Sequence, residues 1–218
     1  MQSSTTNPAL DLESAYEACR TITRREAKNF YYAFLTLPAT KRRAIYAAYA
    51  FCRHCDDSVD EETSTDAKLK ALAELQANLN SIYSGGASSP VYVALADVAH
   101  NYDIPQKYFQ EVILGVESDL VKDRFQNFEE LKEYCYRVAS VVGLICLQIF
   151  GYKDDDAKKY AVDLGLAMQL TNRRDYLGYE LTAQLGLRYD RRSLEIVDGD
   201  DETRTAGLAF LSVFASLR

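Results

Sequence analysis

Residues 49–62 read YAFCRHCDDSVDEE and contain two sets of side chains that could bind a metal ion. Cys52 and Cys55 form a CxxC pair around His54, a spacing found in zinc and redox sites. Asp56 and Asp60 stand four residues apart, a spacing that suits Mg²⁺ and phosphate. The first set implies thiolate chemistry and the second implies phosphate chemistry.

The thiolate interpretation lacks ligands, because a zinc site takes about four of them. No second CxxC or HxxxH pair occurs among the remaining candidates, which are Cys19, Cys135, Cys146 and His100. A thioredoxin-like motif follows a strand at the start of a helix, whereas this pair falls inside a helical pattern. The sequence therefore predicts that these cysteines pack as small apolar residues.

The residues around Asp56 and Asp60 support the carboxylate interpretation. On a helix, Asp56 and Asp60 share one face with Cβ atoms about 6 Å apart, and they repel unless solvated or joined by a cation. Mg²⁺ commonly takes one or two carboxylates and completes its shell with substrate phosphate oxygens. Arg53 shares that face and could bind phosphate through two hydrogen bonds. On spacing alone, a solvated acidic helix end that continues into Glu61 and Glu62 explains the aspartates at least as well.

Helical periodicity dominates the chain, and no alternating strand pattern is convincing. Thr40 is expected to cap the helix that leads to the aspartates, and Asn127 with Glu130 forms a capping box. The predicted helices cover about residues 11–37, 40–60, 67–83, 127–150, 154–171 and 208–217, and two more are predicted to start at Pro90 and near Pro105. The predicted class is all-α, with residues 1–218 as one domain and residues 1–10 disordered.

Composition narrows the function classes. A net charge of −7 argues against nucleic-acid binding, which needs a basic surface. No secretory leader pattern is visible, and the most apolar segment, 138–150, is shorter than the run of about 18 residues that a membrane span needs. Five cysteines without a leader fit reduced thiols. We expect a cytoplasmic protein without a membrane-spanning helix, and the sequence makes no prediction of oligomeric state.

Several ordered blocks resemble the squalene/phytoene synthases, which join two prenyl diphosphates head to head. The blocks are AKNFYYAFLTLP, KRRAIYAAYAFCRHCDDSVDE, VILGVESDL, FEELKEYCYRVASVVGL and GLAMQLTN. The resemblance implies a helical bundle of the isoprenoid synthase type with a central cavity, Mg²⁺ or Mn²⁺ as cofactor, and prenyl diphosphates as substrates. The block variants look most like bacterial enzymes that make a C30 presqualene or squalene-type product from farnesyl diphosphate. A phytoene-type enzyme that uses geranylgeranyl diphosphate is the alternative.

The resemblance also implies roles for the first acidic region. Asp56 and Asp60 would hold Mg²⁺ against the diphosphate, and Asp57 belongs to the same motif. Arg53 would bind the diphosphate and Tyr49 would line the reacting end. Peripheral membrane contact for release of an apolar product is a further hypothesis.

The other blocks supply the rest of the implied site. One group would line the cavity or face the diphosphate: Asn29, Phe30, Phe34, Tyr134, Val138, Val142 and Gly143. Gln169 and Asn172 match residues that orient or ligate a second metal, and Asp119 matches a further acid of the family. The apolar members would be core residues in any helical bundle.

The match breaks after Asn172, where the family's second acidic motif continues as Ile-Leu-Arg-Asp and this chain reads RRDYLGYEL. In one explanation, Asp175 is the motif's aspartate moved by one residue, which turns it about 100° off the metal face. In the other, which we favour, a segment with both aspartates is missing between Asn172 and Arg173. Asp175 is therefore a secondary metal candidate. A catalytically impaired relative that serves as a binding or assembly protein is the competing function.

Overall fold

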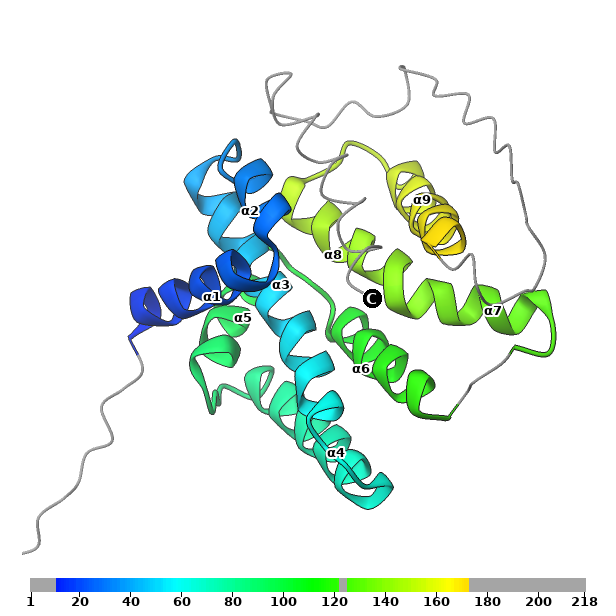
Figure 1. The fold of residues 1–218 in the computed structure, drawn as a ribbon. Helices are drawn as coiled ribbons and strands as arrows, with labels where there is room; N and C mark the ends of the chain where they lie inside the picture. The colour runs from blue at the N-terminus through cyan, green and yellow to red at the C-terminus, as the bar shows by residue number, and fades with distance from the viewer. Residues whose placement is uncertain (1–10, 122–124, 173–218) are drawn as a thin grey trace, which may run out of the picture.

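The computed structural model describes residues 11–121 and 125–172, and all regular structure in these two ranges is helical (Figure 1). The elements in chain order are α1 (Leu12–Glu26), α2 (Lys28–Phe34), α3 (Ala39–Asp60), α4 (Thr65–Ile82), α5 (Pro90–Asn101), α6 (Gln106–Val121), α7 (Phe128–Cys135), the π-helical segment η1 (Tyr136–Ser140), α8 (Val141–Phe150) and α9 (Asp156–Asn172). The predicted all-α class is confirmed. The predicted helix over residues 208–217 lies outside the described residues.

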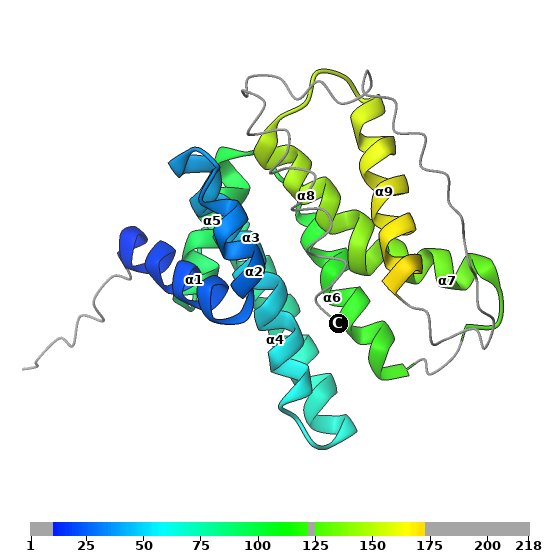
Figure 2. The same cartoon turned by 45° about the horizontal axis from the view of Figure 1, so that its top comes forward.

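Helix α3 is the centre of the bundle. It packs against α1, α4 and α5 on one side and against α6 and α8 on the other. Figures 1 and 2 show α1 to α5 grouped together and α6 to α9 grouped beside them, with α9 resting on α8 and η1. One continuous apolar core runs from α1 to α8, and a smaller cluster joins α7 to α9. Residues on α3 can therefore face either half of the molecule.

Local signals explain most of the helix starts. Pro90 begins α5, and the Asn127 side chain accepts a hydrogen bond from the Glu130 amide at 3.0 Å, as predicted. Thr40 does not cap α3, because the helix already begins at Ala39, directly after Pro38. The fixed φ of proline suits that position, and its missing N–H costs nothing at a helix start.

The single helix predicted before Pro38 is two helices. The chain breaks at Ala27, whose backbone φ and ψ are −109° and 49°. One turn earlier, the buried Thr23 hydroxyl donates to the Cys19 carbonyl at 2.9 Å and lies 3.4 Å from the Tyr46 carbonyl of α3. Back-bonding of this kind bends helices, and the second acceptor comes from a distant element.

The predicted long helix over residues 127–150 is continuous but contains the π segment η1. Phe128–Phe150 is long and apolar enough to cross a membrane by length and composition, and it extends beyond the segment 138–150 that the sequence analysis identified as most apolar. In the fold, 72% of its most apolar window is buried, as in the core helix of many globular proteins.

Candidate active site

The C-terminal end of α3 carries the acidic cluster. Asp56 and Asp57 are half-buried there and Asp60 is exposed. The Asp57 carboxylate forms an ion pair with Arg53 one turn earlier, with Nη2 and Oδ1 2.5 Å apart and both side chains about 30% exposed. Asp57 therefore orients the guanidinium, whereas Asp56 and Asp60 occupy the adjacent face of the helix.

The guanidinium group of Arg53 is suited to binding an anion. Burial lowers the pKa of its guanidinium, but Asp57, Glu26 and Asp56 raise it, and the net pKa shift is upward. Its Nε atom is buried and has no hydrogen-bond partner among the described residues. A buried donor without an acceptor is costly, so this atom indicates that a ligand oxygen belongs beside it.

Buried aromatic residues, here called the aromatic wall, lie along α3 before its acidic end and on the neighbouring helix α2. Tyr49 lies one turn before Arg53 and is fully buried, and burial raises the pKa of its phenol, which stays protonated at neutral pH. Phe34 of α2 is also buried and packs edge-on against Tyr46, with ring centroids 6.0 Å apart. This wall keeps water from the inner side of α3.

The CxxC pair takes no part in this arrangement. All five cysteines of the chain are buried thiols. Burial raises the pKa of Cys55 well above its ordinary value, which makes the thiolate form unfavourable. Among the described residues, no group of three or more His, Cys, Asp and Glu side chains could hold a metal ion. The prediction that these cysteines are packing residues is confirmed.

A second wall comes from the helices after residue 125. Tyr134 and Val138 pack with Leu166 and Leu170 of α9, and the ring of Phe125 lies 5.0 Å from that of Tyr134. Val142, which we placed with them, belongs instead to the main core. The π segment explains this separation, because its wider turns change the register between Tyr134 and α8.

The remaining predicted site residues that fall within helices lie on four of them. Gln169 of α9 is buried and Gly143 lies in the buried part of α8. Asp119 of α6 is exposed. Asn29 and Phe30 lie in α2 and Asn172 ends α9, but their side chains fall outside the described part of the structure, as does Asp175.

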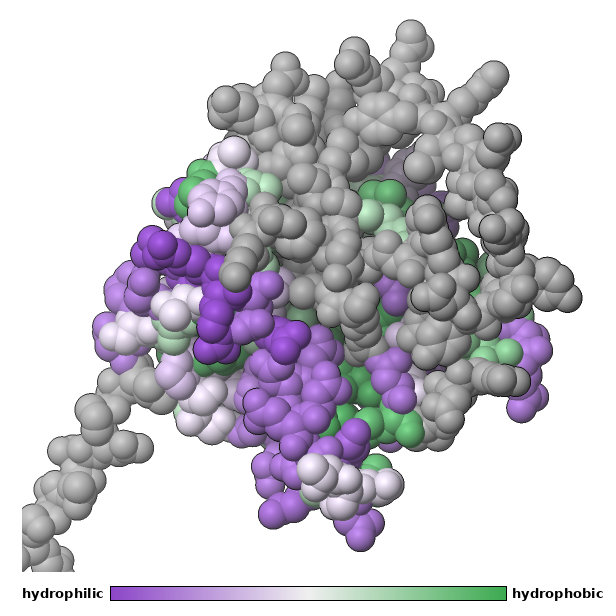
Figure 3. All heavy atoms as spheres, viewed as in Figure 1, coloured by the Kyte–Doolittle hydropathy of each residue, from purple (hydrophilic) through white to green (hydrophobic). Residues whose placement is uncertain are grey.

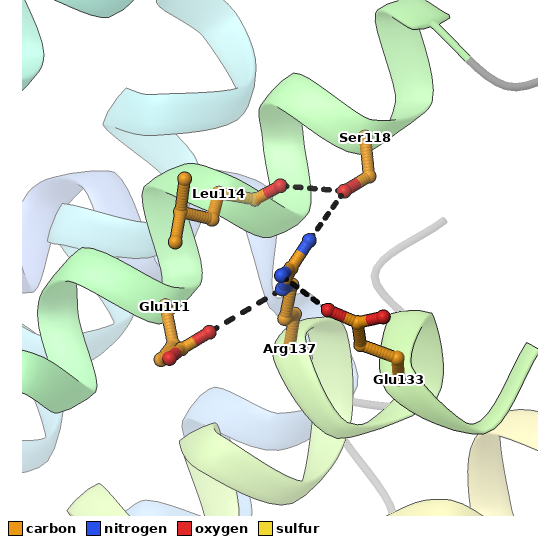
Figure 4. Close-up of polar contacts among 5 residues, drawn as sticks. All are labelled: Glu111, Leu114, Ser118, Glu133 and Arg137. Atoms are coloured by element: carbon orange, nitrogen blue, oxygen red, sulfur yellow. Dashed lines mark hydrogen bonds and ion pairs between the residues drawn. The ribbon is translucent and has the colours of Figure 1, made fainter. Parts of the chain in front are cut away.

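Arg137 is a half-buried anchor that we did not predict. Its Nε lies 3.3 Å from a carboxylate oxygen of Glu111, its Nη2 donates to Glu133 at 2.5 Å, and its Nη1 donates to the Ser118 hydroxyl at 3.3 Å (Figure 4). Ser118 in turn donates to the Leu114 carbonyl. The arginine thereby fixes η1 against α6. In the sequence, the only sign of this network is that Glu133 stands four residues before Arg137. Exposed ion pairs on helices commonly have the same spacing, so it does not identify an anchor.

Comparison with known proteins decides the family. The family model for squalene/phytoene synthase matches residues 23–182. The chain belongs to the squalene/phytoene synthase family. It is 37% identical over 171 residues to a phytoene synthase of Arthrospira platensis, covering 72% of this chain and 55% of the relative. It is 38% identical over 172 residues to a phytoene synthase of Mycobacterium tuberculosis, covering 77% and 56%.

Solved structures agree with this squalene/phytoene synthase assignment. The squalene synthase HpnC from Alicyclobacillus acidocaldarius superposes with a TM-score of 0.69 at 30% identity, over 75% of this chain and 62% of that one. A dehydrosqualene synthase in complex with ligand superposes with a TM-score of 0.67 at 34% identity, over 74% and 56%. This family member spans about half the length of the curated relatives it matches.

The donor set fits the divalent cation that the family implies. Asp56 and Asp60 offer two carboxylates from one helix face, and Asp57 is held by Arg53. Mg²⁺ suits a site with two protein carboxylates when substrate phosphate oxygens complete its shell. The orphaned Nε of Arg53 is consistent with a phosphate oxygen at this end of α3.

Proposed function

We propose that this chain is a Mg²⁺-dependent prenyltransferase that joins two prenyl diphosphates head to head and releases diphosphate. The observation that carries the proposal is Arg53, a partly buried cation with a free Nε, beside Asp56 and Asp60 in a squalene/phytoene synthase sequence. A diphosphate head would meet the acidic end of α3, and an apolar chain would follow the aromatic wall.

Each group has a defined task in this proposal. Arg53 binds diphosphate oxygens, and Asp57 keeps the guanidinium in place. Asp56 and Asp60 would hold Mg²⁺, which when bound neutralises charge on the departing diphosphate. Tyr49 and Phe34 exclude water from the reacting carbon, and their aromatic faces favour positive charge within about 6 Å.

The condensation step balances without an added oxidant or reductant. The allylic C–O bond of one substrate breaks, and diphosphate leaves with the electron pair. The double bond of the second substrate attacks that carbon, a proton is lost, and a cyclopropylcarbinyl diphosphate forms. In a later step the second diphosphate would leave with its electron pair and the carbon skeleton would rearrange. Loss of a proton would then give a linear product with a new double bond, whereas a linear product without that double bond would need hydride from an external reductant.

Two substrate lengths compete. The sequence blocks around Asn29 and Asp56 favour farnesyl diphosphate and a C30 product. The relatives named phytoene synthase, at 37% and 38% identity, favour geranylgeranyl diphosphate and a C40 product. Cytoplasmic location and peripheral membrane contact for product release also stay predictions.

The decisive experiment supplies the full chain with Mg²⁺ and each labelled diphosphate in turn, and analyses the products by length. Asp56→Asn and Asp60→Asn should each lower turnover by about 100-fold or more, because each removes a carboxylate that stabilises the leaving group. Glu62→Gln, which changes an exposed carboxylate two residues further on, should leave turnover unchanged.

The possible outcomes separate the candidate functions. A C30 or a C40 product identifies the substrate length. Tight binding of a prenyl diphosphate without turnover would favour a binding or assembly role, as the altered sequence after Asn172 suggests. A folded protein that neither binds nor converts either substrate would contradict the proposal.

A further inference from the structure

A pocket of about 390 Å³ lies between α1 and the first turns of α3. Three guanidinium groups line it, from Arg20 of α1 and from Arg42 and Arg43 of α3. Arg42 and Asp56 are 14 residues apart on one straight helix, which places them about 20 Å apart along its axis. The pocket is therefore separate from the acidic end of α3.

We propose that this pocket binds a phosphate group, either free or carried by a lipid headgroup. Three guanidinium groups around one small space repel one another, and the two glutamates of the pocket lining offset only part of their charge. Their planar forks suit phosphate oxygens, to which each arginine can donate two hydrogen bonds. The proposal is independent of the prenyltransferase function.

The three guanidinium groups are already held on the pocket wall. Arg20 Nε donates to the Tyr31 hydroxyl at 3.0 Å, and Arg42 Nη1 donates to the Leu35 carbonyl at 3.1 Å. The Arg43 guanidinium stacks over the ring of Tyr16, 4.6 Å from its centroid. Each contact leaves other N–H groups for a ligand and reduces the side-chain entropy that binding would remove.

A phenol supplies a further donor. Tyr46 lines the pocket and is 97% buried, and its hydroxyl has no hydrogen-bond partner within the described part of the chain. Burial raises the pKa of Tyr46 to about 12, so the phenol is protonated at neutral pH and able to donate. A buried donor of this kind is satisfied by a ligand oxygen.

Two carboxylates compete for the arginines but hold them weakly. Glu17 pairs with Arg20 at 3.1 Å and Glu13 pairs with Arg43 at 3.2 Å. The glutamate side chains are 62% and 77% exposed, so water screens both pairs. A doubly charged phosphate that contacts several guanidinium groups at once should displace them.

The surrounding segment favours an anionic partner. Residues 20–43 contain seven Lys or Arg and one Glu, a net charge of +6 in a chain of net charge −7. Beside the pocket, Tyr32 is 71% exposed and Leu35 is 44% exposed. The surface around α1 carries strongly hydrophilic side chains among paler, less polar ones (Figure 3). Basic and apolar residues together suit a lipid surface, whereas the pocket alone suits a free phosphate.

The test measures two ligands on the full chain without Mg²⁺, in an Arg53→Gln background that removes phosphate binding at the acidic end of α3. One ligand is inorganic diphosphate, followed by calorimetry. The other is vesicles of phosphatidylglycerol, compared with vesicles of phosphatidylcholine in a sedimentation assay. The pocket variant is Arg42→Gln with Arg43→Gln, and its matched control is Arg24→Gln with Arg25→Gln, which removes the same charge outside the pocket lining.

We expect the pocket variant to weaken binding at least about tenfold, because charge-assisted hydrogen bonds are lost, and the control to weaken it less than about threefold. Tyr46→Phe, which keeps the ring and removes the hydroxyl, should weaken binding in the same direction. Binding of diphosphate identifies a free phosphate, and binding of phosphatidylglycerol alone identifies a headgroup. Equal loss in the pocket variant and its control, or no binding of either ligand, would overturn the proposal.

Discussion

At the scale of single residues, the surroundings of Arg53 fix both the orientation and the charge of its guanidinium group. Its ion pair with Asp57 fixes the guanidinium, and the field of Glu26 and Asp56 raises its pKa against the effect of burial. A surface ion pair would contribute little, but this pair is about two-thirds buried and leaves Nε without an acceptor. The arginine is thus oriented before any substrate arrives.

Replacement of Arg53 should weaken the binding of diphosphate and leave the fold unchanged. Arg53→Gln should lower kcat/KM by about 10- to 100-fold, because hydrogen bonds to charged groups contribute about 1.5–3 kcal/mol. Steady-state kinetics with the prenyl diphosphate that the product analysis identifies would measure the change in kcat/KM. Lys70→Gln, which changes an exposed cation on α4, is the control. If the Arg53 variant kept full kcat/KM, the diphosphate role would be wrong.

His54 should make the stability of the protein depend on pH. Burial lowers its pKa below the usual 6.5, although Asp57 and Glu61 act in the opposite direction. The folded chain therefore binds this proton less readily than the unfolded chain does. The stability contribution is complete above a pH of about 6.5 and decreases as the pH falls below that value.

Thermal unfolding at pH 7.5 and pH 5.5 would measure this dependence. Acidification should lower the melting temperature of the wild-type protein more than that of His54→Phe. The phenylalanine ring keeps the edge-on contact with Tyr92, whose ring centroid lies 5.6 Å from that of His54. The other titrating groups are common to both proteins and cancel. An identical loss in the two proteins would show that His54 titrates alike in the folded and unfolded states.

At the scale of elements, the backbones of η1 and α9 approach each other closely at Gly165, where a larger residue would not fit. A Cβ atom on Gly165 would lie 2.5 Å from Cα and 2.7 Å from the backbone nitrogen of Ser140. The Ser140 hydroxyl also donates to the Val162 carbonyl at 2.7 Å. These contacts set the position of Gln169, one turn further along α9.

Gly165→Ala should therefore lower the free energy of unfolding by about 1–3 kcal/mol, because rigid backbone must move to admit the methyl group. Gly115→Ala is the matched control, since its nearest neighbour at 3.1 Å is a methyl group of the Val138 side chain, which needs to shift by only a few tenths of an ångström. Both changes gain helix propensity equally. Chemical denaturation would measure the difference, and equal effects would contradict the close contact.

The Arg137 network predicts a second difference in stability. Arg137→Met should lower the free energy of unfolding by about 1–3 kcal/mol, because Glu111, only 17% exposed, loses its charged partner. Glu133→Gln removes a 60% exposed partner and should cost less than about 0.5 kcal/mol. Urea unfolding of both variants would test this, and the reverse order would refute the assignment of Arg137 as the anchor.

The sequence predicted the elements better than their contacts. Proline and asparagine signals act within a few residues, so the starts of α5 and α7 were predictable. The break at Ala27 depends on Thr23 meeting Tyr46 of another helix, and the role of Arg137 depends on Glu111 of α6. No local pattern contains such partners. The acidic end of α3 was predictable because its residues share one helix.

At the scale of the molecule, α3 carries both proposed sites. Its first turns line the phosphate pocket with Arg42 and Arg43, and its last turns carry Asp56 and Asp60. The helix spans about 30 Å and contacts both halves of the bundle. Cations are thus gathered near one end and carboxylates at the other, which keeps two sites for anionic ligands apart.

The absence of a three-ligand cluster among the described residues leads to a prediction about metal binding. Two carboxylates alone hold Mg²⁺ weakly, and substrate oxygens must complete its shell. Mg²⁺ alone should therefore raise the melting temperature by less than about 1 °C. Mg²⁺ with a non-hydrolysable prenyl diphosphate at 100 times its Kd should add about 2.7 kcal/mol, or roughly 5–10 °C for a domain of this size.

Differential scanning calorimetry with each ligand alone, with both together and after addition of a chelator separates the two contributions. Asp56→Asn should abolish the joint increment, because the metal then lacks one of its two protein ligands. Glu62→Gln should keep it, since that carboxylate is exposed beyond the end of α3. A full shift with Mg²⁺ alone would mean that the protein forms a complete metal site without substrate. Stabilisation by the diphosphate that the chelator does not reduce would mean that arginines bind the phosphate without a metal. Loss of this stabilisation in Arg53→Gln would place that binding at the acidic end of α3, and its loss in Arg42→Gln with Arg43→Gln would place it in the pocket.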